Sequence, residues 1–310
     1  MQPETPPQRP LRGIALKLGS VLVFIVMSAL IKATADRVPP GQAVFFRSFF
    51  ALPVILVWLG LRRELTTGLG TRNPVGHVWR GLMGTAAMGF GFAGLAFLPL
   101  PEVTAIGYAA PLLTVIFAAM FLGEEVRAFR IGAVGLGLAG VLIVASPRLT
   151  LNSGASAAEA LGALLVLFGA VFAALAQVFV RKLVNGEKTS TIVFWFSVTA
   201  SLVSLLTLPW GWVWPHPDEA ALMVTTGILG GIGQILLTSS YREADASLIA
   251  PFDYASMLFA LLIGYFAFGE VPTATMLAGA ALVITAGCLI IWRERQLGLK
   301  RDRQRKAMTP

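Results

Sequence analysis

Two charged residues interrupt long apolar runs of this chain: Arg47 lies in the run 41–61 and Asp253 in the run 246–268. If such a run crosses a membrane, an ionisable residue inside it is by default a functional candidate, because a charge in hydrocarbon is costly. Arg47 could orient a substrate, or its long side chain could reach the outer interface. Asp253 could carry a coupling proton, bind a cation, hydrogen-bond a substrate or form a structural pair.

Uncharged polar and aromatic residues inside other apolar runs extend this set of candidates. Tyr108 and Tyr254 each offer a ring and a hydroxyl, and Trp195 offers a further stacking surface. Gln177 and Gln234 carry amides that need partners in hydrocarbon. Helix packing explains any one of these residues as well as contact with a substrate does, so both alternatives stay open.

Two prolines and two glutamates are candidates for hinges or gates. Pro111 and Pro251 fall inside apolar runs, where a proline frees the carbonyl four residues earlier and breaks or bends a helix. Such breaks can act as hinges or line a cavity. Glu124 and Glu270 lie at the ends of runs, where an anchoring or gating role fits better than contact with a substrate.

The sequence offers no catalytic or metal-binding group set. Cys288 is the one cysteine, which excludes an intrachain disulfide and a cysteine-based metal site. His77 and His216 lie at run edges without partners at metal-ligand spacing. Two G-x-G-x-x-G matches, at 89–94 and 135–140, lie inside apolar runs without the strand that a dinucleotide fold needs. We read these glycines as helix-packing positions, and we expect no cofactor, no metal and no enzymatic activity.

The elements that would position these residues are membrane helices. The chain has 310 residues, of which 56% are hydrophobic and 13% charged, against about 25% charged in a soluble domain. Helices satisfy every backbone group in lipid, and the runs lack the alternation of barrel strands. Ten spans are predicted, at 14–34, 41–61, 76–98, 102–122, 129–146, 160–180, 190–210, 219–240, 246–268 and 273–292.

The second half of the chain repeats the first. The stretch 105–124 matches 251–270 at a constant offset of 146 residues, which places Tyr108 on Tyr254 and Glu124 on Glu270. Further collinear matches extend the repeat over about 130 residues. Because each half has an odd number of spans, the halves enter the membrane from opposite sides. The sequence thus predicts an all-α integral membrane protein of ten transmembrane helices, as two inverted five-helix repeats.

Loop charges predict the orientation. With the N-terminus in the cytoplasm, 20 of the 24 Lys and Arg residues lie on the inner side. Both termini are therefore expected in the cytoplasm, in a bacterial inner membrane. The net charge of +8 then reflects topology and contact with lipid headgroups, not nucleic-acid binding.

The predicted organisation has five parts. They are a disordered N-terminus (1–12), a first repeat (13–147), an extracytoplasmic linker (148–159), a second repeat (160–292) and a basic cytoplasmic tail (293–310). A cleaved signal peptide is the alternative for the first span, with Ala33-Thr34-Ala35 as the cleavage site. Cleavage would leave nine spans and destroy the match between the halves.

This pattern resembles the drug/metabolite transporter superfamily, EamA type, over 13–292. The resemblance rests on the five-plus-five helices, on Gly-Glu closing the fourth and ninth, on Phe46-Arg47 and on 251–254. Met257 at the repeat position of Pro111 departs from exact duplication. Members of the family move small metabolites, including amino acids, nucleotide sugars, S-adenosylmethionine and riboflavin, and the first half is similar to the riboflavin-transporter-like group.

We therefore expect a secondary transporter that works by alternating access. Few charges and several aromatic residues suit a neutral or zwitterionic, partly aromatic solute such as riboflavin. An exporter of amino acids or other metabolites and an S-adenosylmethionine carrier are the alternatives. A membrane enzyme would need catalytic groups that are not visible, and a receptor would need a large exposed domain. Protons or another ion are the expected coupling partner, and a homodimer is compatible with the sequence.

Overall fold

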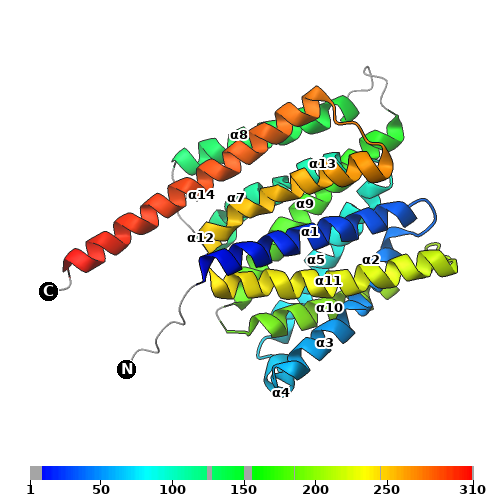
Figure 1. The fold of residues 1–310 in the computed structure, drawn as a ribbon, viewed down its shortest axis with the longest axis horizontal. Coiled ribbons are helices and arrows are strands. Elements are labelled where there is room, and N and C mark those ends of the chain that lie inside the picture. Colours follow the sequence, from blue (N-terminus) through cyan, green and yellow to red (C-terminus); the bar gives the residue numbers. More distant parts are fainter. Residues whose placement is uncertain (1–8, 124–127, 150–155, 185, 245, 309–310) are drawn as a thin grey trace.

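The computed structural model describes residues 9–123, 128–149, 156–184, 186–244 and 246–308, and these residues form helices without any strand. The helices lie side by side in one bundle, and both termini are at the same end of it (Figure 1). Each predicted span corresponds to one helix or to one broken helix. The helices of the first half are α1 (Pro10–Thr34), α2 (Pro40–Phe49), α3 (Ala51–Leu61), α4 (Leu65–Leu69), α5 (Pro74–Leu95), α6 (Leu100–Gly107), α7 (Ala109–Leu122) and α8 (Ala128–Leu149).

In the second half the counterpart of α2 and α3 is one unbroken helix, α4 has no counterpart, and the counterpart of α6 is divided in two. Its helices are α9 (Ala157–Leu183), α10 (Thr189–Leu205), α11 (Pro217–Glu243), α12 (Ala246–Ile249), the 3-10 helix η2 (Ala250–Tyr254), α13 (Ala255–Phe268) and α14 (Ala274–Met308).

Eight helical stretches of the described chain are long and apolar enough to cross a membrane, which makes this a multi-pass membrane protein. The other two predicted spans are α5 and α10. Both are helices of the same bundle, packed against each other and against α2. Helix α10 is shorter than the other eight stretches, with 17 residues. Helix α5 is less apolar than they are, because it is rich in glycine and carries His77 and Arg80. The short helix α10 and the glycine-rich helix α5 therefore meet inside the bundle.

Proline explains two of the breaks. Pro53 and Pro111 are each the third residue of the helix after a break, and α2 and α6 each end at the residue four before that proline. Since a proline cannot donate to that carbonyl, the helix is interrupted there, as predicted for Pro111. Pro251 lies in η2, where the α-helical path is replaced by a 3-10 turn. The predicted hinge positions therefore all lie at or next to real interruptions of helices.

The repeat is visible in the bounds of α7 and α13. Both helices have 14 residues, and α13 starts and ends 146 residues after α7. Each ends on a left-handed glycine, Gly123 at φ 67° and Gly269 at φ 66°. A residue with a Cβ would be strained in this conformation, which accounts for the glycine of the Gly-Glu pair. The bounds of the two helices match although Met257 stands at the repeat position of Pro111. The position of the break is therefore set by packing as well as by proline.

Helix pairing follows the same two-fold relation. Helix α1 packs along α11, and α9, its repeat equivalent, packs along α5. Equivalent helices also pack on each other: α2 on α10, and α8 on α14. These contacts join the two halves over the whole bundle, as expected when one two-fold axis relates them.

The two halves run in opposite directions. At one end of the bundle, which we call the Lys32 end, α1 finishes at Lys32 and α9 begins next to Glu159. Two ion clusters, described in the next section, join the end of α1 and the start of α9 to α6. Both of these helix ends therefore lie at the same end of the bundle. At the other end, the Lys17 end, α1 begins and α9 finishes. Opposite direction of equivalent helices is the arrangement expected for inverted repeats.

Close glycine contacts hold α8 against α14. A Cβ on Gly140 would meet the carbonyl oxygen of Gly279 at 2.8 Å, and the converse distance is 2.7 Å. In the G-x-G-x-x-G matches, Gly94, Gly137 and Gly140 likewise abut neighbouring helices, which confirms the packing interpretation at these positions. A Cβ on Gly89, Gly91 or Gly135 would meet nothing within 4 Å.

The boundaries differ from the predicted ones at the two ends of the chain. Helix α1 begins at Pro10, so Arg12 is helical, because proline is well suited to a first helical position. Helix α14 continues from its membrane span to Met308 and takes in the basic tail (Figure 1). Residues 1–8, Glu124 and half of the predicted linker, 150–155, lie outside the described residues.

Candidate functional site

The two tyrosines of the repeat contact each other. Their ring centroids are 5.1 Å apart with an edge-on angle of 68°. The Tyr108 hydroxyl lies 2.6 Å from the Ser256 hydroxyl, and the Tyr254 ring packs against Gly287 on α14. Both tyrosines are helix caps, at the break between α6 and α7 and at the end of η2. The interrupted parts of the fourth and ninth spans therefore meet at this pair.

Asp253, in η2, pairs with Lys17 of α1. The Lys17 ammonium lies 2.7 Å from the Asp253 carboxylate and 5.3 Å from the centre of the Tyr241 ring. The Lys17 side chain is 2% exposed and that of Asp253 is 49% exposed. The Lys17 side chain is thus buried inside the bundle, whereas the Asp253 side chain is half exposed at the Lys17 end.

Glu270 ties three elements together at the Lys32 end. Its carboxylate lies 3.0 Å from the Lys32 ammonium and accepts a hydrogen bond from the backbone of Leu100. Lys32 also donates to the carbonyls of Leu95 and Leu98. Because the two side chains are 16% and 13% exposed, this cluster closes the bundle where α1, α5, α6 and α13 meet.

A second ion cluster joins α6 to other helices at the same end. Arg148 donates to both carboxylate oxygens of Glu102 and to Glu159. The two carboxylates come from the start of α6 and the start of α9. A planar guanidinium suits such a bidentate bridge, and it joins the last turn of α8 to both helices.

Arg47 lies against Arg80 and Phe196. The guanidinium carbons of Arg47 and Arg80 lie 5.5 and 3.8 Å from the centre of the Phe196 ring. Arg47 is 5% exposed, and Nε and Nη1 of both arginines are buried without a hydrogen-bond partner. The ion pairs found in the described part of the chain include neither arginine. Two cations therefore share one aromatic ring within the bundle.

Contact with the ring does not balance the burial of these cations. A cation–π contact contributes about 0.5–2 kcal/mol. Placing an arginine at the centre of a membrane helix costs about 2.5–3.5 kcal/mol, and each unsatisfied buried donor adds ~1–3 kcal/mol. A group that supplies acceptor oxygens and negative charge would remove most of this cost.

A loop at the Lys17 end is organised around Glu187. Its carboxylate accepts hydrogen bonds from the Thr71 hydroxyl and from the backbones of Arg72 and Asn73, and His77 lies 3.8 Å away. Burial raises the pKa of Glu187, but these hydrogen bonds outweigh it and hold the pKa below its usual value. The carboxylate thus stays ionised and fixes the loop before α5 to the loop before α10.

The remaining predicted site residues come from α9, α10 and α11, and Trp195 lies beside His77, with ring centres 6.4 Å apart. The Trp195 indole donates to the Leu69 carbonyl at 2.9 Å, which fixes α10 to α4. Gln177 is exposed and Gln234 is half-buried. Arg47 and Asp253 have separate partners, Phe196 with Arg80 and Lys17 respectively.

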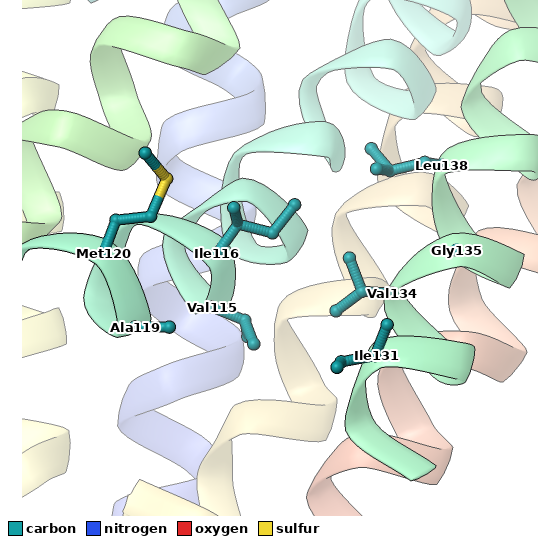
Figure 2. A pocket seen from close by; sticks show the side chains of 8 residues that line it. All are labelled: Val115, Ile116, Ala119, Met120, Ile131, Val134, Gly135 and Leu138. Atoms are coloured by element: carbon teal, nitrogen blue, oxygen red, sulfur yellow. The ribbon is translucent and has the colours of Figure 1, made fainter. Parts of the chain in front are cut away.

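One apolar groove lies between α7 and α8, with a volume of about 380 Å³. Figure 2 shows side chains of both helices facing each other across it. Its lining is aliphatic apart from Met120, with no charged or hydroxyl side chain. The groove therefore offers no group that could orient a polar solute. Its lining residues are Val115, Ile116, Ala119, Met120, Ile131, Val134, Gly135 and Leu138.

Sequence reasoning missed three partners of the predicted residues. Lys17, Lys32 and Arg80 lie within predicted spans but were not singled out as candidates, and each contacts a charged or aromatic partner inside the bundle. The spacing of Lys17 and Lys32 near the two ends of one apolar run was the available signal. Within the described residues, no group of His, Cys, Asp and Glu could hold a metal ion.

The fold and its paired, interrupted helices define a class of membrane transporter. The EamA-like transporter family model matches the chain twice, over residues 11–146 and 160–292, and the chain belongs to this family. A solved crystal structure with 23% identity has a TM-score of 0.64, with 92% of this chain and 98% of the other covered, and shares the fold.

Relatives with assigned names transport different compounds. A pseudopaline exporter of Pseudomonas aeruginosa is 28% identical, with 92% of this chain and 97% of the relative covered. An S-adenosylmethionine uptake transporter of Rickettsia bellii is 27% identical over the same shares. A riboflavin transporter of Rhizobium johnstonii is 28% identical, with 95% of both chains covered. The family and these relatives are transporters of small molecules, not enzymes.

Proposed function

We propose that this protein is a secondary transporter that carries a neutral or zwitterionic, partly aromatic metabolite by alternating access. The contact of Tyr108 with Tyr254 at two helix interruptions carries the proposal. Interrupted helices near the middle of the bundle are where transporters of inverted repeats bind their solutes. The tyrosine rings and hydroxyls can contact a solute with a ring system and polar edges.

The two ion pairs of α1 support an alternating-access cycle. The Lys32–Glu270 cluster is largely buried, whereas Asp253 is half exposed. We infer that this conformation is closed at the Lys32 end, whereas the Lys17 end is held by the more exposed Lys17–Asp253 pair. Asp253 would bind a coupling proton or a cation there, and its release from Lys17 would accompany opening of that end.

The placement in the membrane follows from loop charges. Exposed basic residues gather at the Lys17 end, including Arg62, Arg63, Arg72 and Lys188. The positive-inside rule puts this end in the cytoplasm, with both termini on that side of a bacterial inner membrane. Glu270 then gates the outer face.

Riboflavin and S-adenosylmethionine are the first two solutes to test, because relatives are named for them. The experiment is uptake and efflux of labelled solutes in proteoliposomes, with and without a proton gradient. We expect one solute to move faster than in protein-free liposomes, and the gradient to change its steady state. If no solute of an aromatic and amino-acid panel moves faster than in protein-free liposomes, the proposal is wrong.

A further inference from the structure

We propose that Arg47 and Arg80 form a binding site for a carboxylate group of the transported solute. The inference rests on the proposed transport function and narrows the solute to a zwitterion that carries a carboxylate. Arg47 is 5% exposed and lies in α2, about 10 Å along the helix from its first residue. Arg80 lies about 10 Å along α5. Both reach the ring of Phe196 from α10.

The chain itself supplies no anion to these two arginines. Nε and Nη1 of both residues are buried without a hydrogen-bond partner, and neither residue is in an ion pair of the described chain. The other carboxylates inside the bundle are engaged elsewhere: Glu270 with Lys32, and Glu102 with Arg148. An arginine fork is shaped to accept a carboxylate through two parallel hydrogen bonds.

Hydroxyl groups on the same helices are also unpartnered. Ser48 and Ser197 follow Arg47 and Phe196 in sequence, are 0% and 1% exposed, and have no hydrogen-bond partner. Buried polar groups are nearly always paired, so such a concentration of exceptions on two packed helices indicates a ligand. The hydroxyls and the guanidinium groups can all donate to oxygen, which is the chemistry of an anion site and not of a cation site.

The repeat shows that the fold does not need these charges. Phe196 stands at the repeat position of Arg47, and Thr226 at that of Arg80. Glycines flank the cluster in both halves, since Gly84 lies against Arg80 and Phe196 and Gly230 lies against Arg47. The glycines that pack against the cluster are therefore present in both halves, whereas the arginines are present only in the first half. An asymmetric pair of cations gives a polar solute one orientation between two similar halves.

The first test uses the unmodified protein with matched acids and amides. The probes are L-tryptophan, 3-phenylpropionate and their primary amides, with thermal stability and binding measured by scanning fluorimetry and calorimetry. We expect at least one acid to bind at least tenfold more tightly than its amide, and excess chloride not to reproduce the effect. If acid and amide act alike, or neither binds, the carboxylate site is refuted. If chloride stabilises the protein as well as the acids do, the cluster holds a structural anion and the inference is also refuted.

Variants then locate the site. Arg47→Gln and Arg80→Thr should each weaken binding of the acid at least tenfold, and Arg47→Lys should weaken it less. Arg62→Gln is the matched control, because Arg62 also stacks on an aromatic ring, Trp58, but on the surface. Unchanged acid binding in folded Arg47→Gln and Arg80→Thr would overturn the assignment. Transport of a neutral solute by proteoliposomes that bind no acid would refute this site and leave the proposed function standing.

Discussion

At the scale of single residues, the informative side chains are charges whose partners come from distant parts of the sequence. Lys17 and Asp253 are 236 positions apart and lie 2.7 Å from each other. A buried ion pair is costly to break from one side, because the remaining charge is left without a partner. In the proposed cycle the half-exposed Asp253 exchanges its partner for a proton or a cation, whereas the buried Lys17 stays in place.

Asp253→Asn tests this exchange. We expect gradient-driven transport to fall at least tenfold, because the coupling charge is lost, and the melting temperature to drop, because Lys17 is left unpaired. The double variant Lys17→Gln with Asp253→Asn should regain stability but not transport. Proteoliposome flux and scanning fluorimetry separate the two effects. Restored coupled transport in the double variant would show that the pair is structural.

Gly287→Ala tests the position of the tyrosine pair. A Cβ at 287 would overlap the ring of Tyr254, so the ring must move and its contact with Tyr108 must change. We expect weaker solute binding with an unchanged yield of folded protein. Gly132→Ala is a control on α8, because its Cβ would meet nothing within 4 Å. Equal affinities in the two variants would mean that the tyrosine pair does not contact the solute.

At the scale of helices, three spans are interrupted, and two interruptions meet in the tyrosine pair. A break frees backbone groups and allows the pieces on either side to move separately. The cluster around Glu270 restrains the far end of one of these broken helices. Flexibility at the break and restraint at the helix end together suit a gate.

Exchanging the charges of Lys32 and Glu270 tests the gate. Lys32→Gln or Glu270→Gln alone should raise cysteine accessibility at the outer end severalfold and slow transport, because the closed outer state is weakened. The double exchange Lys32→Glu with Glu270→Lys should recover part of the closure. The accessibility of a cysteine placed at Leu98 reports the state. Unchanged accessibility in both single variants would contradict the gate.

Pro251→Ala tests the break in the ninth span. Alanine can donate the backbone hydrogen bond that proline lacks, so α12 should extend through η2 and the exchange between states should slow. Pro147→Ala is the control, because Pro147 lies inside the unbroken α8. Equal transport rates in the wild type and in Pro251→Ala would show that the break is not a moving part.

At the scale of the whole molecule, the two halves pack with equivalent helices against each other and with opposite direction. The orientation in the membrane determines which end of the bundle faces the cytoplasm, and so which gate is the inner one. We predict that the loop residues Asp36 and Trp214 are outside, whereas Arg72 and Gly186 are inside. After Cys288→Ser, single cysteines at these positions should react with an impermeant reagent only at 36 and 214. The reverse pattern would invert the assignment of both gates.

Much of the fold could be predicted from the sequence, because membrane helices are encoded locally. The lengths of the apolar runs predicted the spans. The repeat offset of 146 residues predicted that α7 and α13 start and end at equivalent positions. The candidate sites were harder, because hydropathy gives depth along a helix but not the neighbour that each face meets. Asp253 was found from its position, but its partner Lys17 depends on how α1 packs. Arg80 was not singled out, because it lies near the weakly apolar start of its span and its contact with Phe196 depends on how α5 packs.

Helix α1 is held to the ninth span by one ion pair at each end, Lys17 with Asp253 and Lys32 with Glu270. If each face opens when its own pair separates, a conformation open at both faces would lose both pairs at once. The loss of both attractions would then raise the free energy of that leaking conformation. Each conformation that is open at one face would keep one of them. Protection against passive ion leak would thus come from electrostatics as well as from steric closure. A variant that lacks both pairs should carry a proton current across a bilayer that neither single variant shows.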